Sequence, residues 1–133
     1  VNQPGAPCED HAHDLEQWMF IYKGRVPFLD SPETDIDRWL AELETLASLQ
    51  PPPRFVIPGH GTASDDVRLA VGATRDYITY LRDAMRQAVA DFVPFDQAYQ
   101  ATDWSVYESM PAFEASNRGN AYRIYLEMEA TSF

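Results

Sequence analysis

The feature that most constrains the fold is a short apolar run, Phe55–Ile57, which ends abruptly in Pro-Gly-His-Gly at positions 58–61. A short β-branched and aromatic run bounded by proline and glycine is typical of a buried strand. Gly59 and Gly61 allow the backbone to turn sharply on both sides of His60. Open α/β sheets bind their ligands at the carboxyl ends of their strands. Because imidazole is the commonest protein metal ligand, the run predicts a metal-binding histidine at such an edge.

The remaining patterns predict few strands and several helices. A second apolar run, Trp18–Tyr22, is consistent with another buried strand. One helix is predicted to begin with Ser31 as its N-cap and Pro32 at its first position, with acids at 33, 35 and 37 in its first turns, and to end before the prolines at 51–53. Its apolar stripe is Ile36, Leu40, Leu43 and Ala47, widened by Trp39 and Leu46. The longest helix is expected from the polar cap at 64–66 to about residue 92, with shorter helices at 96–101, 103–108 and 120–129. The apolar stripe of this longest helix is Thr74, Ile78, Leu81, Met85, Val89 and Phe92. Two or three strands with four or five helices indicate an α/β fold.

Length and charge limit the class of protein. The 133 residues fit one domain, and the formal net charge of −11 disfavours nucleic acid and favours cations, including divalent metals. No apolar run approaches the ~20 residues that a membrane span needs. No signal peptide pattern is visible, so a soluble, cytoplasmic protein is expected. Cys8 is the only cysteine and excludes an internal disulfide.

Three groups of residues resemble a known family. The segment Lys23–Phe28 is similar to the one that follows the family's metal-bridging aspartate, and Val56–Gly61 is similar to its late histidine motif. The C-terminal segments 76–89, 111–113 and 117–122 are similar to its last helices. In this order the segments resemble the C-terminal half of a metallo-β-lactamase-fold zinc hydrolase, of the quinoprotein-relay or sulfur-oxidation metallohydrolase subgroup.

The resemblance implies a truncated half of an αββα sandwich. Residues 18–133 would form the half domain, and residues 1–17 an irregular N-terminal arm. The half that carries the family's first histidine cluster is absent, and Met19 stands near the position of the bridging aspartate. Because a half domain would expose the face and edge of its sheet, we expect a homodimer that completes the fold.

The N-terminal arm offers further metal ligands. His11 and His13 are one residue apart, so an extended segment would place both imidazoles on the same side. Together with His60 they would form a three-histidine zinc site with an open water position, and Asp14 or Asp10 could add an oxygen. Each histidine also has a simpler interpretation: a solvated arm for His11 and His13, and a hydrogen-bonded loop residue for His60.

Two functions follow from these predictions. The first is a zinc-dependent hydrolase, in which one or two zinc ions generate hydroxide and Asp14 orients the water or accepts its proton. Its small-molecule substrate would be a phosphotriester, lactone, thioester or sulfate ester. The alternative is a non-catalytic remnant of a metallo-β-lactamase domain that forms a dimer or binds a partner protein.

Overall fold

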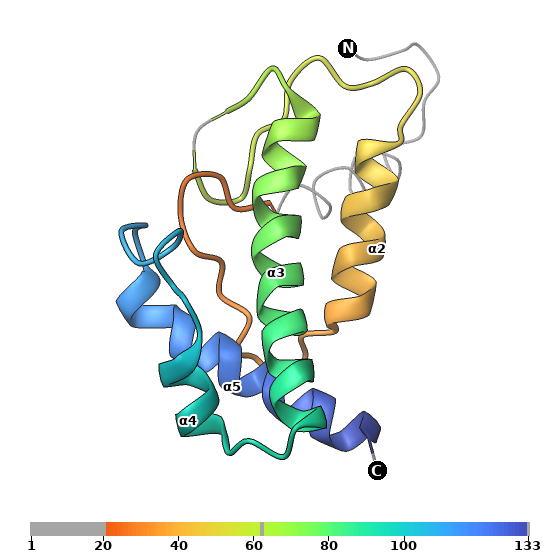
Figure 1. Ribbon diagram of the computed structural model, residues 1–133. Coiled ribbons are helices and arrows are strands. Elements are labelled where there is room, and N and C mark those ends of the chain that lie inside the picture. Colours follow the sequence, from red (N-terminus) through yellow and green to blue (C-terminus); the bar gives the residue numbers. More distant parts are fainter. Residues whose placement is uncertain (1–20, 62, 133) are drawn as a thin grey trace.

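The computed structural model describes residues 21–61 and 63–132. Their helices, in chain order, are α2 (Ile36–Ala47), α3 (Val67–Ala90), α4 (Phe95–Ala101) and α5 (Phe113–Ser132). Helices α2 and α3 lie side by side and antiparallel, and α5 crosses the lower half of α3 (Figure 1). Helix α3 contacts each of the other three, so it is the centre of the fold.

The predicted α/β fold is wrong, because residues 21–61 and 63–132 contain no sheet. Their strand-like pairing consists of two isolated bridges, Tyr22 with His60 and Val56 with Ser64. Helix α3 explains why Tyr22 joins no sheet: the Tyr22 N–H donates to the Thr74 hydroxyl at 2.9 Å, and this hydroxyl donates back to the Tyr22 carbonyl at 3.2 Å. A helix side chain thus takes hydrogen bonds that a neighbouring strand would otherwise make.

Helix α2 confirms the predicted apolar stripe but not the predicted start. Ile36, Trp39, Leu43 and Leu46 are buried on one face. The helix begins at Ile36 with Asp35 as its N-cap, and the Asp35 carboxylate accepts the Arg38 N–H at 2.9 Å. The predicted start at residues 31–32 is wrong because that segment forms a turn, in which the Thr34 N–H donates to the Ser31 carbonyl.

Helix α3 confirms most of its prediction, including the cap. Asp66 is the N-cap, and its carboxylate accepts the Leu69 N–H at 3.1 Å. Phe92 was expected on the buried stripe, but it lies beyond the helix, at φ +57°, and is 78% exposed. The predicted helix 103–108 is also wrong, since residues 105–109 form turns, whereas α5 is longer than predicted. The buried members of the predicted α3 stripe are Thr74, Ile78, Leu81, Met85 and Val89.

The described residues bury a core of their own. It includes large, fully buried side chains from α2, α3, α5 and the segments between them: Ile21, Leu29, Ile36, Leu43, Val56, Ile78, Leu81, Met85 and Ile124. The reason for expecting a homodimer was an exposed half sheet, and this reason does not apply to a helical core. Dimerisation itself stays a prediction. The N-terminal arm, residues 1–17, and Met19 lie outside the described residues.

Asn120 of α5 connects the core to an extended segment. Its side-chain oxygen accepts the Leu29 N–H at 2.7 Å, and its amide nitrogen donates to the Pro27 carbonyl at 2.6 Å. The same nitrogen donates to the Tyr77 hydroxyl at 3.0 Å, and this hydroxyl donates to the Asn117 side chain at 2.7 Å. Burial raises the pKa of Tyr77, so its hydroxyl keeps the proton that it donates. One amide therefore satisfies the backbone of residues 27–29 inside the core.

Asn120→Ala should lower the free energy of unfolding by about 3–5 kcal/mol, because it leaves several buried polar groups without partners. Urea denaturation followed by circular dichroism measures the effect. Gln97→Ala, which removes an exposed amide on α4, should change the stability by no more than about 0.5 kcal/mol. Equal effects of the two substitutions would contradict the role of Asn120.

Gly61 follows His60 in its loop and has a backbone conformation that favours glycine. Its φ is +108°, and a Cβ at this position would collide with the Lys23 carbonyl oxygen. Next to it, the Lys23 N–H donates to the His60 carbonyl at 3.0 Å. Only glycine fits this position without displacing the backbone of residue 23.

Gly61→Ala should therefore destabilise the fold by about 3 kcal/mol, through combined backbone strain and collision. Gly24→Ala is a matched control, since Gly24 has φ +75° but free space around its Cβ position, and should cost only about 1–2 kcal/mol. Chemical denaturation of both variants gives the comparison. A Gly24 variant as unstable as the Gly61 variant would show that the collision is unimportant.

Candidate functional site

His60 lies in a loop, not at the end of a strand. The loop is closed by paired hydrogen bonds between Val56 and Ser64, at 2.7 and 2.8 Å. The imidazole is exposed and stacks on the Tyr22 ring, with 4.6 Å between centroids and 18° between planes. Burial raises the pKa of the Tyr22 hydroxyl. The contacts around His60 are thus those of a hydrogen-bonded, stacked loop residue.

The described residues contain no group of histidine, cysteine, aspartate and glutamate side chains that could hold a metal ion. The expectation of a zinc centre at the edge of a metallo-β-lactamase-like sheet is therefore wrong for this part of the chain. His11, His13, Asp14 and Asp10 lie outside the described residues. A zinc site made by His11 and His13 with His60 stays a prediction.

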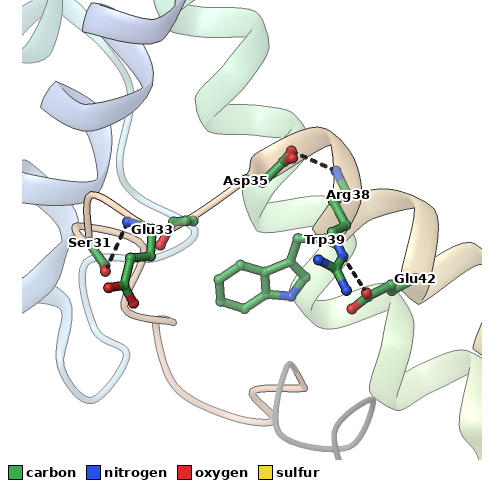
Figure 2. Close-up of a pocket in the computed structure, with 7 residues that line it drawn as sticks. Ser31, Glu33, Asp35, Arg38, Trp39 and Glu42 are labelled. Carbon is green, nitrogen blue, oxygen red and sulfur yellow. Dashed lines mark hydrogen bonds and ion pairs between the residues drawn. The ribbon is translucent and has the colours of Figure 1, made fainter. Parts of the chain in front are cut away.

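A different site opens at the start of α2 (Figure 2). It is a pocket of about 350 Å³, within the size range of ligand sites in proteins, and we call it the Trp39 pocket. The indole of Trp39 lies at its centre, with Ser31 and Glu33 on one side and Arg38 and Glu42 on the other. Its lining residues are Ser31, Glu33, Thr34, Asp35, Arg38, Trp39 and Glu42.

The Trp39 pocket has an excess of negative charge. Three carboxylates line it, from Glu33, Asp35 and Glu42, against the single cation of Arg38. The Arg38 guanidinium is already engaged by Glu42, with its Nε 2.9 Å from the carboxylate (Figure 2). Glu33 has no ion-pair partner within residues 21–61 and 63–132. The pocket therefore offers carboxylates on the Glu33 and Asp35 side to an incoming positive charge.

The wall of the pocket, residues 31–35, is held by α5. Arg123 donates from Nη2 to the Pro32 carbonyl at 3.3 Å and to the Thr34 carbonyl at 3.5 Å. These carbonyls therefore face α5, which is the physical reason why the helix predicted to begin at Ser31 does not form there. On the other side, Trp39 is only 7% exposed and lies against Tyr22, with ring centroids 6.2 Å apart. Both sides of the pocket are fixed by residues distant in sequence.

A second hollow, of about 630 Å³, lies between α4 and α5. Phe95 and Tyr122 form its aromatic wall, with ring centroids 4.9 Å apart. The only cation lining it, Arg118, is 2.6 Å from the Asp96 carboxylate and lies over the Phe95 ring. Because its cation is engaged and its walls are aromatic, this hollow has less chemistry to offer a charged ligand than the Trp39 pocket.

The sequence did contain a signal for the Trp39 pocket. Asp35 and its neighbouring acids were interpreted only as first-turn residues of a helix, and Trp39 as part of its apolar stripe. Their combination, carboxylates beside an indole on the buried stripe, is what marks the site. Residues 31–34 turn away from the helix and open the pocket. This depends on Arg123, which lies about 90 residues later in the chain.

Comparisons with known proteins give no relatives: no family profile, characterised protein or solved structure matches the chain significantly. With a helical core in place of a sheet, the resemblance to a metallo-β-lactamase half domain is wrong. The hydrolase activity that the resemblance implied stays a prediction. In the part of the chain that the structure describes, no helix is long and apolar enough to cross a membrane.

His60→Ala should lower the free energy of unfolding by about 0.5–1.5 kcal/mol in the presence of a chelator, since it loses one aromatic contact with Tyr22. Thermal denaturation with and without added zinc provides the measurement. If zinc raises the melting temperature of the natural protein and not of the variant, His60 binds metal, and the stacked-loop interpretation is incomplete.

Proposed function

We propose that this chain is a non-catalytic binding module that takes a basic side chain of a partner protein into the Trp39 pocket. The single observation that carries the proposal is the arrangement in Figure 2: an indole lies among three carboxylates, and Arg38, the one cation among the described residues that line the pocket, is already paired with Glu42. A lysine or arginine side chain matches this arrangement, because it combines an apolar stem with a positive head.

The carboxylates supply the charge recognition. The Asp35 carboxylate accepts the backbone N–H of Arg38 through one oxygen, Oδ1 at 2.9 Å, which fixes its position at the start of α2. Glu33 stands two residues before Asp35 in the same wall, where its N–H donates to the Ser31 hydroxyl oxygen at 3.4 Å. A positive head group between these two side chains would form charge-assisted hydrogen bonds with both.

The indole supplies the apolar contact. Trp39 is 7% exposed and lies against Tyr22, so the stem of a basic side chain would contact the small part of the indole that stays accessible. Preorganised aromatic side chains are favourable contact surfaces because little conformational entropy is lost when they bind.

The charge of the whole chain favours the same class of partner. A formal net charge of −11 attracts basic proteins over a distance of about one Debye length and raises their association rate at low salt. A partner-binding protein is also the alternative that the sequence analysis gave, here without a metallo-β-lactamase origin.

A short peptide with one lysine, neutral flanking residues and blocked termini tests the proposal. It should shift the NMR signals of the Trp39 indole N–H and of residues 31–35, with an affinity that weakens as salt is added. An arginine peptide tests the other basic side chain. The acetyl-lysine peptide keeps the stem but loses the charge, so it should not bind measurably. Equal shifts with the acetylated and the charged peptide would overturn the proposal.

Glu33→Gln should weaken binding of the lysine peptide by about two- to fivefold, the size expected for one exposed ion pair. Glu108→Gln is the matched control, because it removes the same charge from an exposed turn outside the pocket. It should leave the dissociation constant almost unchanged. If both substitutions weaken binding equally, net charge alone explains the affinity. Stoichiometric zinc in the purified protein would instead support the metal-dependent alternative.

A further inference from the structure

The Arg38 side chain lines the Trp39 pocket but uses only part of its hydrogen-bonding capacity there. Its Nε atom is 2.9 Å from Oε1 of Glu42. Its two Nη nitrogens make no hydrogen bond or ion pair with the residues that the structure describes, and the side chain is 75% exposed. A guanidinium bound through Nε alone still presents the edge formed by both Nη nitrogens, which fits a second carboxylate. The pocket therefore offers a positive edge as well as its carboxylates.

Helix stability does not explain an arginine at position 38. Arg38 is the third residue of α2, in the first turn, where the helix dipole favours acids and disfavours cations. Its partner Glu42 comes four residues later, which is the less favourable order for such a pair, because the acid is better placed first. Residues that violate local preferences without a gain in stability are typical of functional sites. We therefore look for the role of Arg38 in the pocket that it lines.

The charges of the pocket are arranged in a definite order. Figure 2 shows Glu33 on one side of the Trp39 indole and Arg38 on the other, so negative charge, indole and positive edge follow one another across the site. A ligand that matches this order has a cation, an apolar middle and an anion. A lysine or arginine residue with a free α-carboxylate has all three, since its stem joins the charged head to the carboxylate. Within a chain, the same residue has a neutral peptide group in place of the carboxylate.

We propose that the Trp39 pocket recognises a lysine or arginine at the C-terminus of a partner protein, and that Arg38 binds the terminal carboxylate. This rests on the proposed function, which places the basic head at Glu33 and Asp35. The carboxylate accepts hydrogen bonds from the two Nη nitrogens of Arg38, a planar, charge-assisted pairing that arginine favours. The Nε bond to Glu42 holds the guanidinium in place during this contact. Arg38 thus selects the end of a chain over a basic residue within it.

Two peptides that differ only at the last group test the proposal. Both are acetylated at the N-terminus, neutral except for a final lysine, and end either in a free carboxylate or in a carboxamide. The natural protein should bind the free carboxylate about two- to fivefold more tightly, the size expected for one exposed ion pair, as measured by NMR titration. The net charge of −11 alone predicts the opposite order, because the carboxylate lowers the positive charge of the peptide.

Arg38→Gln should abolish this preference for the free carboxylate. The variant should bind the carboxamide peptide at least as tightly as the natural protein does, because a cation near the lysine head is lost, and the free carboxylate more weakly. Opposite effects on the two peptides cannot come from unfolding. Arg86→Gln is the matched control, since Arg86 is an exposed helix arginine paired with Asp83 at 3.4 Å and does not line the pocket. It should keep the preference of the natural protein.

A third peptide separates the chain end from any nearby anion. It has a carboxamide end and a glutamate two residues after the lysine, on the same side of an extended segment. If it binds as tightly as the free carboxylate peptide, recognition of the chain end is overturned. If the natural protein binds the carboxamide and the free carboxylate equally, the role of Arg38 is overturned and the proposed function stands. If it binds neither, the proposed function itself fails.

Discussion

The structure depends on one buried amide, that of Asn120. Its side-chain oxygen and nitrogen hold the backbone at Leu29 and Pro27, and the nitrogen also donates to the Tyr77 hydroxyl in the centre of the fold. A non-helical segment can lie inside a helical core only if its backbone groups find partners there. Asn120 provides those partners, and so fixes where the following residues emerge at the surface to form the wall of the Trp39 pocket.

Local patterns predicted the helices well because their determinants are local. The stripe of Ile36, Leu43 and Leu46, and the cap at Asp66, depend on residues a few positions apart. The error in fold class has a different origin. An apolar run such as Phe55–Ile57 fits a strand. Whether it joins a sheet depends on which groups hydrogen-bond to the backbone of the neighbouring segments. Here the Thr74 hydroxyl hydrogen-bonds to both the N–H and the carbonyl of Tyr22. Nothing in the sequence around Tyr22 predicts these bonds.

The site was less predictable than the helices for a related reason. Glu33 and Asp35 were expected in the first turns of a helix, but Arg123 binds the carbonyls of Pro32 and Thr34, and this segment forms a wall of the pocket beside Trp39. His60 was predicted to bind metal because it is a histidine between two glycines. Gly61 is required there by backbone geometry, however, and the imidazole stacks on Tyr22. A glycine–histidine pattern can thus describe a loop closure as well as a ligand site.

The hydrogen bonds between α5 and residues 27–34 join residues that are about 90 positions apart in the chain. All described residues that line the Trp39 pocket belong to α2 or the segment before it, yet the contacts that shape the pocket form only when Asn120 and Arg123 pack against residues 27–34. Closing so long a loop is slow relative to helix formation. Formation of helix α2 alone therefore does not build the pocket, whose shape depends on the slower, long-range packing of α5.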